Sequence, residues 1–322
     1  MEAVQSSIVI DMLGLWTLDY KKLWAWQSSL DFPEHEYLEL KASGVTVIHP
    51  AVGFVKEGIA NSSWNDLSRW NQLLQAHPDK FVKVLQTSDL ELAKSSGRIG
   101  VVLGLQNSAH FLNVNDVDRY YELGQRVSQL TYFNNHLGGG STDPSCKLTA
   151  YGADVVARMN TLGMAVDLSH CSDRTTLDAI EASTKRALIT HSNCRSLVPG
   201  SGRCKTDEAI RKLAAKGGVF GVTMVRQFVR SSGGASLENM LDHIDRVVRL
   251  TGVEHVGLGT DVDLVGRDAG VPRKYDLDGV RYSEKIFVVA EGLFARGYSK
   301  SDVALILGEN FQRVLGEIWS AS

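Results

Sequence analysis

The chain has little of what marks membrane proteins or proteins that bind nucleic acids. Its 322 residues contain only 6 prolines, and 34 basic residues are balanced by 37 acidic ones. The formal net charge of -3 predicts no attraction to nucleic acid or to an anionic membrane surface. The sequence also lacks a run of about 18 apolar residues, the length that a membrane-spanning helix needs. We therefore expect neither nucleic acid nor membrane as a partner.

Cysteine is scarce, and its spacing is uninformative for metal binding. Cys146, Cys171, Cys194 and Cys204 form no C-x-x-C pair, the spacing typical of zinc knuckles. Unpaired, reduced thiols are typical of cytoplasmic proteins. The first residues also lack the basic stretch and apolar core of a signal peptide. These features predict a cytoplasmic location.

Short apolar segments alternate with helical patterns along the chain. The segments are rich in Val, Ile and Leu, as expected for parallel strands that are buried on both faces. Eight strand-then-helix units predict an α/β fold, a (β/α)8 TIM barrel that forms one domain over residues 1–322, with C-terminal helices at about 299–319 packed on it. A doubly wound sheet is the alternative. The predicted strands are Ile8–Leu13, Val45–His49, Gly100–Gln106, Val127–Tyr132, Ala165–Leu168, Ala187–Thr190, Gly218–Thr223 and His255–Gly259.

Polar side chains follow the ends of several predicted strands. His170 and His191 end two successive strands, Asp261 ends the last one, and Gln106 and Asn107 end the third. In TIM barrels the active site forms at the C-terminal ends of the strands, so we expect these side chains to converge. Two imidazoles and a carboxylate suit a zinc ion with an open water position. The same groups could also act as general acids and bases without a metal.

Long motifs lie between Gln129 and Val225, among them YGADVVARMNTLGMAVDLSHCSDRTTLDAIEAS, ALITHSNCRSL and GGVFGV. HVGLGTDVD and GENFQRV follow nearer the C-terminus. Together these motifs resemble those of bacterial members of the membrane (renal) dipeptidase family. The similarity extends from about Gly97 to the end of the chain. It implies an amidohydrolase-type metal-dependent barrel and a hydrolase that acts on dipeptides through a binuclear zinc site.

The resemblance also implies roles for individual residues. His170 and His191 match two histidine ligands of one zinc, and Asp261 matches an acidic residue that takes part in proton transfer. Arg203 matches an arginine that receives the substrate carboxylate, a task that suits the fork of a guanidinium group. Tyr132 stands where the family has a histidine that contacts the substrate. A small carboxylate-bearing substrate and a homodimer are therefore expected.

The first half of the family's metal site is different in this chain. The family's Asp-Gly-His-x-Asp motif is replaced by DMLGL at Asp11–Leu15, with Leu13 and Leu15 at the ligand positions. Gln106 replaces the bridging glutamate. Leucine has no lone pair to donate, and a neutral amide cannot serve as an anionic bridge between metals. This chain is therefore expected to be a divergent member that holds at most one zinc, at the two histidines together with Asp261.

Three interpretations of function remain open. The first is a hydrolase with one zinc that attacks an amide or peptide bond, with His49 as a further candidate group. The second is a metal-free lyase, isomerase or decarboxylase that uses the two histidines and the aspartate as acid–base groups. In this second case Tyr132, Gln106 and Asn107 would hydrogen-bond the reacting part of the substrate. The third is a non-catalytic protein that binds a small molecule, which is disfavoured because buried polar groups without a ligand are costly.

Overall fold

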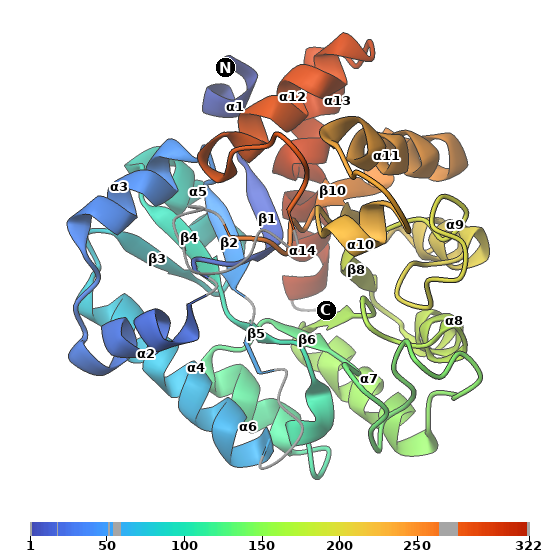
Figure 1. Cartoon of the computed structure of the whole chain (residues 1–322). Coiled ribbons are helices and arrows are strands. Elements are labelled where there is room, and N and C mark those ends of the chain that lie inside the picture. Colours follow the sequence, from blue (N-terminus) through green and yellow to red (C-terminus); the bar gives the residue numbers. More distant parts are fainter. Residues whose placement is uncertain (1, 18, 51, 54–58, 264–275, 321–322) are drawn as a thin grey trace.

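The computed structural model describes residues 2–17, 19–50, 52–53, 59–263 and 276–320. Its centre is a sheet of ten parallel strands in the order β3-β4-β2-β1-β10-β9-β8-β7-β6-β5 (Figure 1). The strands are β1 (Ile10–Gly14), β2 (Val47–Pro50), β3 (Phe81–Val84), β4 (Ile99–Val102), β5 (Gly104–Leu105), β6 (Val127–Gln129), β7 (Ala165–Asp167), β8 (Leu188–Ser192), β9 (Val219–Val222) and β10 (Val256–Leu258).

The sheet closes into a barrel through β4 and β5, which Leu103 alone separates. β4 pairs with β2, and β5 pairs with β6. The carbonyl of Leu103 accepts a hydrogen bond of 2.8 Å from the backbone N–H of Arg126, so the pairing continues across the junction. The two ends of the strand order therefore meet in one segment of chain. The predicted TIM barrel is confirmed, and the predicted strand Gly100–Gln106 corresponds to β4 and β5 together.

Strand β3 was not predicted, and it lies outside the closed ring as a neighbour of β4. Its first residue, Phe81, belongs to an aromatic cluster around Trp16. The Trp16 ring stacks on Phe81 at 5.0 Å between centroids and packs edge-on against Trp70 and Phe32. These contacts come from segments far apart in the chain, so the short FVKV sequence by itself gave no reason to expect a buried strand.

Helices surround the ring of strands (Figure 1). Many begin at a side chain that caps the first free backbone N–H groups, such as Ser172 for α8 and Thr206 for α9. The helices are α1 (Glu2–Ser6), α2 (Tyr20–Ser29), α3 (Glu34–Ala42), α4 (Ile59–Ala76), α5 (Thr87–Ser96), α6 (Asp116–Leu123), α7 (Ala150–Leu162), α8 (Asp173–Ala182), α9 (Asp207–Ala215), α10 (Arg226–Val229), α11 (Leu237–Thr251), α12 (Lys285–Ala295), α13 (Lys300–Ala304) and α14 (Asn310–Trp319).

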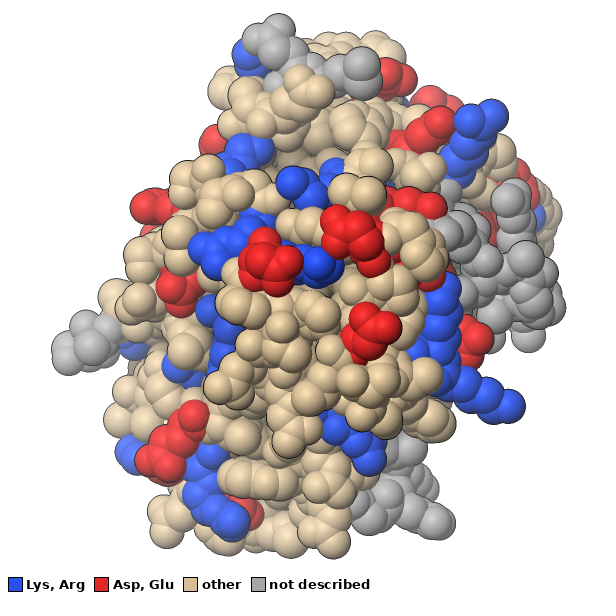
Figure 2. Space-filling model, turned by 90° about the vertical axis from the view of Figure 1, so that its left-hand side faces the viewer, with Lys and Arg blue, Asp and Glu red and all other residues tan. Residues whose placement is uncertain are grey.

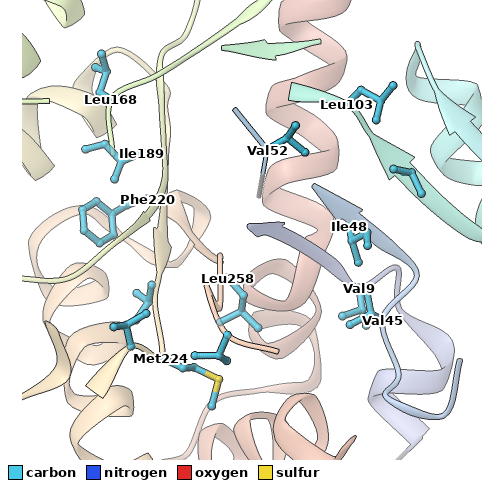
Figure 3. Packing of buried hydrophobic residues seen from close by; sticks show 14 of the residues in the cluster. Val9, Val45, Ile48, Val52, Leu103, Leu168, Ile189, Phe220, Met224 and Leu258 are labelled. Atoms are coloured by element: carbon cyan, nitrogen blue, oxygen red, sulfur yellow. The ribbon is translucent and has the colours of Figure 1, made fainter. Parts of the chain in front are cut away.

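Alternate residues of the strands face the inside of the barrel and the surrounding helices. Val47 and Leu188 belong to a buried cluster inside the barrel that also contains Phe311. The next residues, Ile48 and Ile189, belong to a second cluster, beneath the helices (Figure 3). Both sides of each strand are therefore buried. This explains why the strands appear in the sequence as continuous apolar segments without polar alternation.

Helix α14 closes the base of the barrel and is seen at the centre of Figure 1. Its Phe311 ring is fully buried and lies so close to Gly257 that a Cβ atom there would be 2.3 Å from the ring. The carbonyl of Ile318 similarly approaches Gly163, which precedes β7. An apolar plug therefore fills the N-terminal end of the barrel and leaves the C-terminal end for polar side chains.

The outer surface carries charges of both signs. Figure 2 shows Lys and Arg interspersed with Asp and Glu on one face of the molecule. Among the helices of the described residues, none combines the length and the apolar character needed to cross a bilayer.

Candidate active site

The two histidines singled out in the sequence meet at the C-terminal end of the barrel. His170 follows β7 and His191 lies in β8, and their Nε2 atoms are 3.1 Å apart. Both side chains are buried, and the ring planes are tilted by 55°. Neighbouring parallel strands thus bring two residues that are 21 positions apart into direct contact.

Burial makes both imidazoles neutral. Removal from water lowers the pKa of His170 and of His191 well below its usual value, because the charged imidazolium loses its hydration. The positive charge of Arg203 lowers both pKa values further. At neutral pH each ring therefore carries one N–H and one lone pair.

Gln106 and Tyr132 lie against this histidine pair. The amide Nε2 of Gln106 is 3.3 Å from Nε2 of His191. The Tyr132 ring stacks on His170 with 4.0 Å between centroids and 21° between planes. Asn107 is engaged elsewhere, because its Oδ1 accepts hydrogen bonds from the backbone N–H of Ala109 and from the Asn135 side chain. These contacts give Asn107 a local role in shaping the turn after β5.

Arg203 braces the two segments that carry the histidines. One terminal nitrogen donates to the carbonyl of Ser169 at 2.7 Å, and the other donates to the carbonyl of His191 at 2.6 Å. Its buried Nε has no hydrogen-bond partner among the described residues. The sequence suggested a receptor for a substrate carboxylate. The structure adds this bracing role and leaves further N–H groups of the guanidinium for a ligand.

Asp261 follows β10 with φ of 56°, a left-handed conformation that non-glycine residues seldom adopt. Burial and, to a smaller extent, nearby Asp11 raise the pKa of its carboxyl to about 7, although the charge of Arg203 opposes the shift. The charge of Arg203 acts on the pKa of Asp261 and of both histidines, so one guanidinium is within electrostatic range of all three groups.

Leu13 lies in β1 and Leu15 directly follows it, at the positions where the resemblance implies two metal ligands. Both are buried, and they form a small apolar cluster of their own. Across the described residues, His, Cys, Asp and Glu side chains do not assemble in threes as a metal-binding group would. The donor set therefore does not fit a two-zinc centre. The histidine pair alone has suitable spacing, because two nitrogen ligands of one tetrahedral zinc lie about 3.3 Å apart.

Two further residues, Tyr20 and His49, have strongly shifted pKa values. Tyr20 begins α2, and its pKa is raised to about 12 by burial and by the nearby Asp261 and Tyr132. His49 lies inside the barrel, where its Nδ1 is 3.1 Å from the carbonyl of Val102, and burial lowers its pKa to about 4. The sequence named His49, at the end of a predicted strand, as a further candidate group. Nothing in the sequence signalled that Tyr20 lies within electrostatic range of Asp261.

Known proteins resemble this chain over most of its length. The family model described as "Membrane dipeptidase (Peptidase family M19)" matches residues 57–322. Dipeptidase verJ of Clonostachys rogersoniana is 32% identical over 255 residues, which cover 78% of this chain and 63% of that protein. An uncharacterized protein in the pqqA 5' region of Klebsiella pneumoniae is 27% identical over 275 residues, covering 80% of this chain and 96% of that protein.

Solved structures share the same barrel. An amidohydrolase from Pseudomonas aeruginosa superposes with a TM-score of 0.83 at 25% identity, covering 99% of this chain and 98% of the other. A metallo peptidase from Rhodobacter sphaeroides, liganded with a phosphinate mimic of the dipeptide L-Ala-D-Ala, gives a TM-score of 0.82 at 18% identity, covering 98% and 100%. With its barrel, its strand-end histidines and the family match in agreement, this chain belongs to the membrane dipeptidase family, peptidase family M19.

Proposed function

We propose that this chain is a hydrolase that cleaves an amide or peptide bond in a small, carboxylate-bearing substrate, with at most one zinc ion. The observation that carries the proposal is the buried pair His170 and His191, whose Nε2 atoms lie 3.1 Å apart beside Arg203, which donates to the carbonyls of Ser169 and His191. The family match and the dipeptide mimic bound to the Rhodobacter sphaeroides homologue support a dipeptide-like substrate.

The chain's own groups suggest how such a bond would be attacked. Asp261, with a pKa of about 7, can accept a proton from a water molecule and deliver it to the leaving amine. The Nε of Arg203, which has no hydrogen-bond partner in the part of the chain that the structure describes, and its remaining N–H groups can bind the substrate carboxylate. Gln106 and Tyr132, which lie against the histidine pair, can hold the carbonyl group near the attacking water. These roles need no second metal.

A metal-free lyase, isomerase or decarboxylase is the second candidate. It is favoured by the apolar pair Leu13 and Leu15 and by the lack, within the described ranges, of three ionisable groups arranged as metal ligands. His170, His191 and Asp261 would then act as acid and base groups on a small carboxylate. In this alternative Arg203 would anchor the carboxylate as before.

Metal analysis combined with product identification separates these candidates. The protein is purified without added zinc, its metal content is measured, and small dipeptides and other carboxylates are assayed with and without a chelator. About one zinc per chain, lost in His170→Ala but kept in the exposed control His35→Ala, together with hydrolysis products, supports the hydrolase. Chelator-resistant turnover to products that have not gained the atoms of water supports the second candidate. Binding without any turnover would overturn both.

Three expectations from the sequence stay predictions. They are the organisation of residues 1–322 as one domain, the homodimer and the cytoplasmic location. Light scattering on the purified chain tests the homodimer, and limited proteolysis tests the domain organisation.

A further inference from the structure

The loop after β6 carries two adjacent aromatic side chains that lead outward from the histidine pair. The Tyr132 ring stacks on His170 with 4.0 Å between centroids. The Phe133 ring in turn packs against Tyr132, with 4.9 Å between centroids and 59° between the planes. His170 is 8% exposed, whereas Phe133 is 42% exposed. Contacts between these three rings, the aromatic row, therefore begin at a buried residue of the site and end at the surface.

Hydrogen bonds fix the backbone on both sides of the two aromatic residues. Before them, the hydroxyl of Thr131 donates to the carbonyl of Gly139 at 3.0 Å. After them, the side-chain oxygen of Asn134 accepts from the backbone N–H of Gly140 at 2.8 Å. The segment that carries Phe133 is thus tied twice to the same stretch of the loop. The exposed ring is held in a defined place.

Three consecutive glycines, Gly138–Gly140, form that stretch, and all three are buried. A Cβ atom at Gly140 would lie 2.9 Å from the Cα of Phe133 and 2.9 Å from the carbonyl oxygen of Tyr132. A Cβ atom at Gly139 would collide with the side chain of Cys146. Backbone atoms cannot move aside as the end of a flexible side chain can. The glycines therefore let the chain pass directly beneath the aromatic row and support it.

The place of Phe133 gives its exposure a consequence. A single exposed apolar side chain is common on protein surfaces and implies nothing by itself. Phe133 differs because its ring extends a series of contacts that starts at the histidine pair. A substrate group that leaves the pair along Tyr132 can lie against Phe133, and an apolar group there would remove both surfaces from water. A phenylalanine ring offers no hydrogen-bonding group to a polar substituent.

We propose that Phe133 is a specificity-determining residue that selects substrates with an aromatic or large aliphatic side chain. This inference rests on the proposed function and deepens it by naming the substrate class. The substrate would combine a carboxylate, which Arg203 binds, with an apolar side chain, which packs on Phe133.

The full chain is tested with dipeptides of alanine combined with phenylalanine, leucine or serine, in both orders. We expect kcat/KM of the wild type to favour phenylalanine over serine by about 10-fold in one of the two orders, as burial of an apolar side chain provides. Phe133→Ser should reduce this ratio by about 3–10-fold, and Phe133→Leu should keep part of it. Phe294→Ser is the matched control, because Phe294 lies on α12 and is 40% exposed. It should leave the ratio unchanged.

Binding measurements separate this inference from the proposed function. Calorimetry with propanoate and 3-phenylpropanoate requires no turnover, and we expect the wild type to bind the phenyl acid more tightly. Phe133→Ser should lose this preference, and Phe294→Ser should keep it. If no dipeptide is hydrolysed but this pattern is found, the proposed function falls and the role of Phe133 stands.

Other results would overturn the role of Phe133. They are a wild-type protein without preference for apolar groups, or equal preferences in the wild type and in Phe133→Ser. Unchanged preferences together with a loss of dimer in Phe133→Ser would assign the ring to a subunit contact. If hydrolysis is found alongside any of these results, only the specificity assignment is lost.

Discussion

The carboxylate of Asp11 accepts two hydrogen bonds from Thr260, one of 2.8 Å from the backbone N–H and one of 2.6 Å from the hydroxyl. These bonds join the first strand to the segment after the last strand. The next residue, Asp261, donates its backbone N–H to the carbonyl of Leu13 at 2.7 Å. Asp11 thus has a structural role at the end of the barrel. It anchors the turn that presents Asp261 to the mouth.

Removal of the Asp261 carboxyl should abolish a pH-dependent step. We expect Asp261→Asn to lower kcat/KM by about 100-fold or more, as is typical of a lost general base. In the wild-type protein, activity should rise with pH through a midpoint near 7, because the ionised form accepts the proton. The measurement is kcat/KM against pH for both proteins, with the exposed Asp31→Asn as control. An unchanged pH profile in Asp261→Asn would exclude Asp261 as the base.

The same carboxyl should make stability depend on pH. Its pKa rises from 3.8 in the unfolded chain to about 7 in the folded protein, so the folded state binds more protons between these values. The free energy of unfolding should therefore fall as pH increases from about 4 to about 7. Asp261→Asn lacks this contribution, so its stability relative to the wild type should improve over that range. Urea unfolding at several pH values measures the difference, and parallel curves would contradict the raised pKa.

Restoration of the missing ligands should create a zinc-dependent increase in stability. We expect Leu13→His/Leu15→Asp/Gln106→Glu to be less stable than the wild type without metal, because it buries polar and charged groups at sites that are at most 8% exposed. Zinc binds only the folded form and should raise the Tm of this variant more than that of the wild type. Leu13→Asn/Leu15→Asn controls for polarity. An equal effect of zinc on all three proteins would argue against a lost ligand set.

Arg203 should make the protein prefer substrates that carry a carboxylate over the corresponding carboxamides. If its free N–H groups bind that carboxylate, the wild-type protein prefers an acid over the corresponding carboxamide. Arg203→Met should reduce this preference by about 10-fold or more, the usual worth of a hydrogen bond to a charged group. The ratio of kcat/KM for the two substrates gives the answer. An unchanged ratio combined with lower stability would mean that Arg203 only braces Ser169 and His191.

The base of the barrel should be sensitive to the fit between Phe311 and Gly257. Phe311→Ala removes a fully buried ring and should lower the free energy of unfolding by about 3–5 kcal/mol. Gly257→Ala should also destabilise, because its Cβ would lie 2.3 Å from that ring. The cost of Gly257→Ala should shrink in a Phe311→Leu background, which frees space. Urea unfolding of the four proteins of this double-mutant cycle measures the coupling, and strict additivity would contradict the contact.

The barrel and the position of the two histidines at its C-terminal end were predictable, because short apolar segments and the residues that follow them indicate both. Apolar segments such as Ala165–Leu168 and Gly218–Thr223 mark strands that are buried on both faces. His170 and His191 stand directly after or within such segments, and barrel topology places strand ends together. The loss of a metal ligand at Leu13 stays a prediction, based on the fact that a leucine side chain has no lone pair to donate in any fold.

The amino-acid sequence by itself determined the alternation of strands and helices, the strand-end histidines and the apolar character of Leu13 and Leu15, since these depend on residue type and short spacing. Only the tertiary structure decided that β3 joins the sheet, that Tyr20 approaches Asp261 and that Tyr132 stacks on His170. Those relationships depend on distances between segments that are far apart in the chain or that face one another across strands. The packing of the whole barrel sets these distances, and local sequence does not encode them.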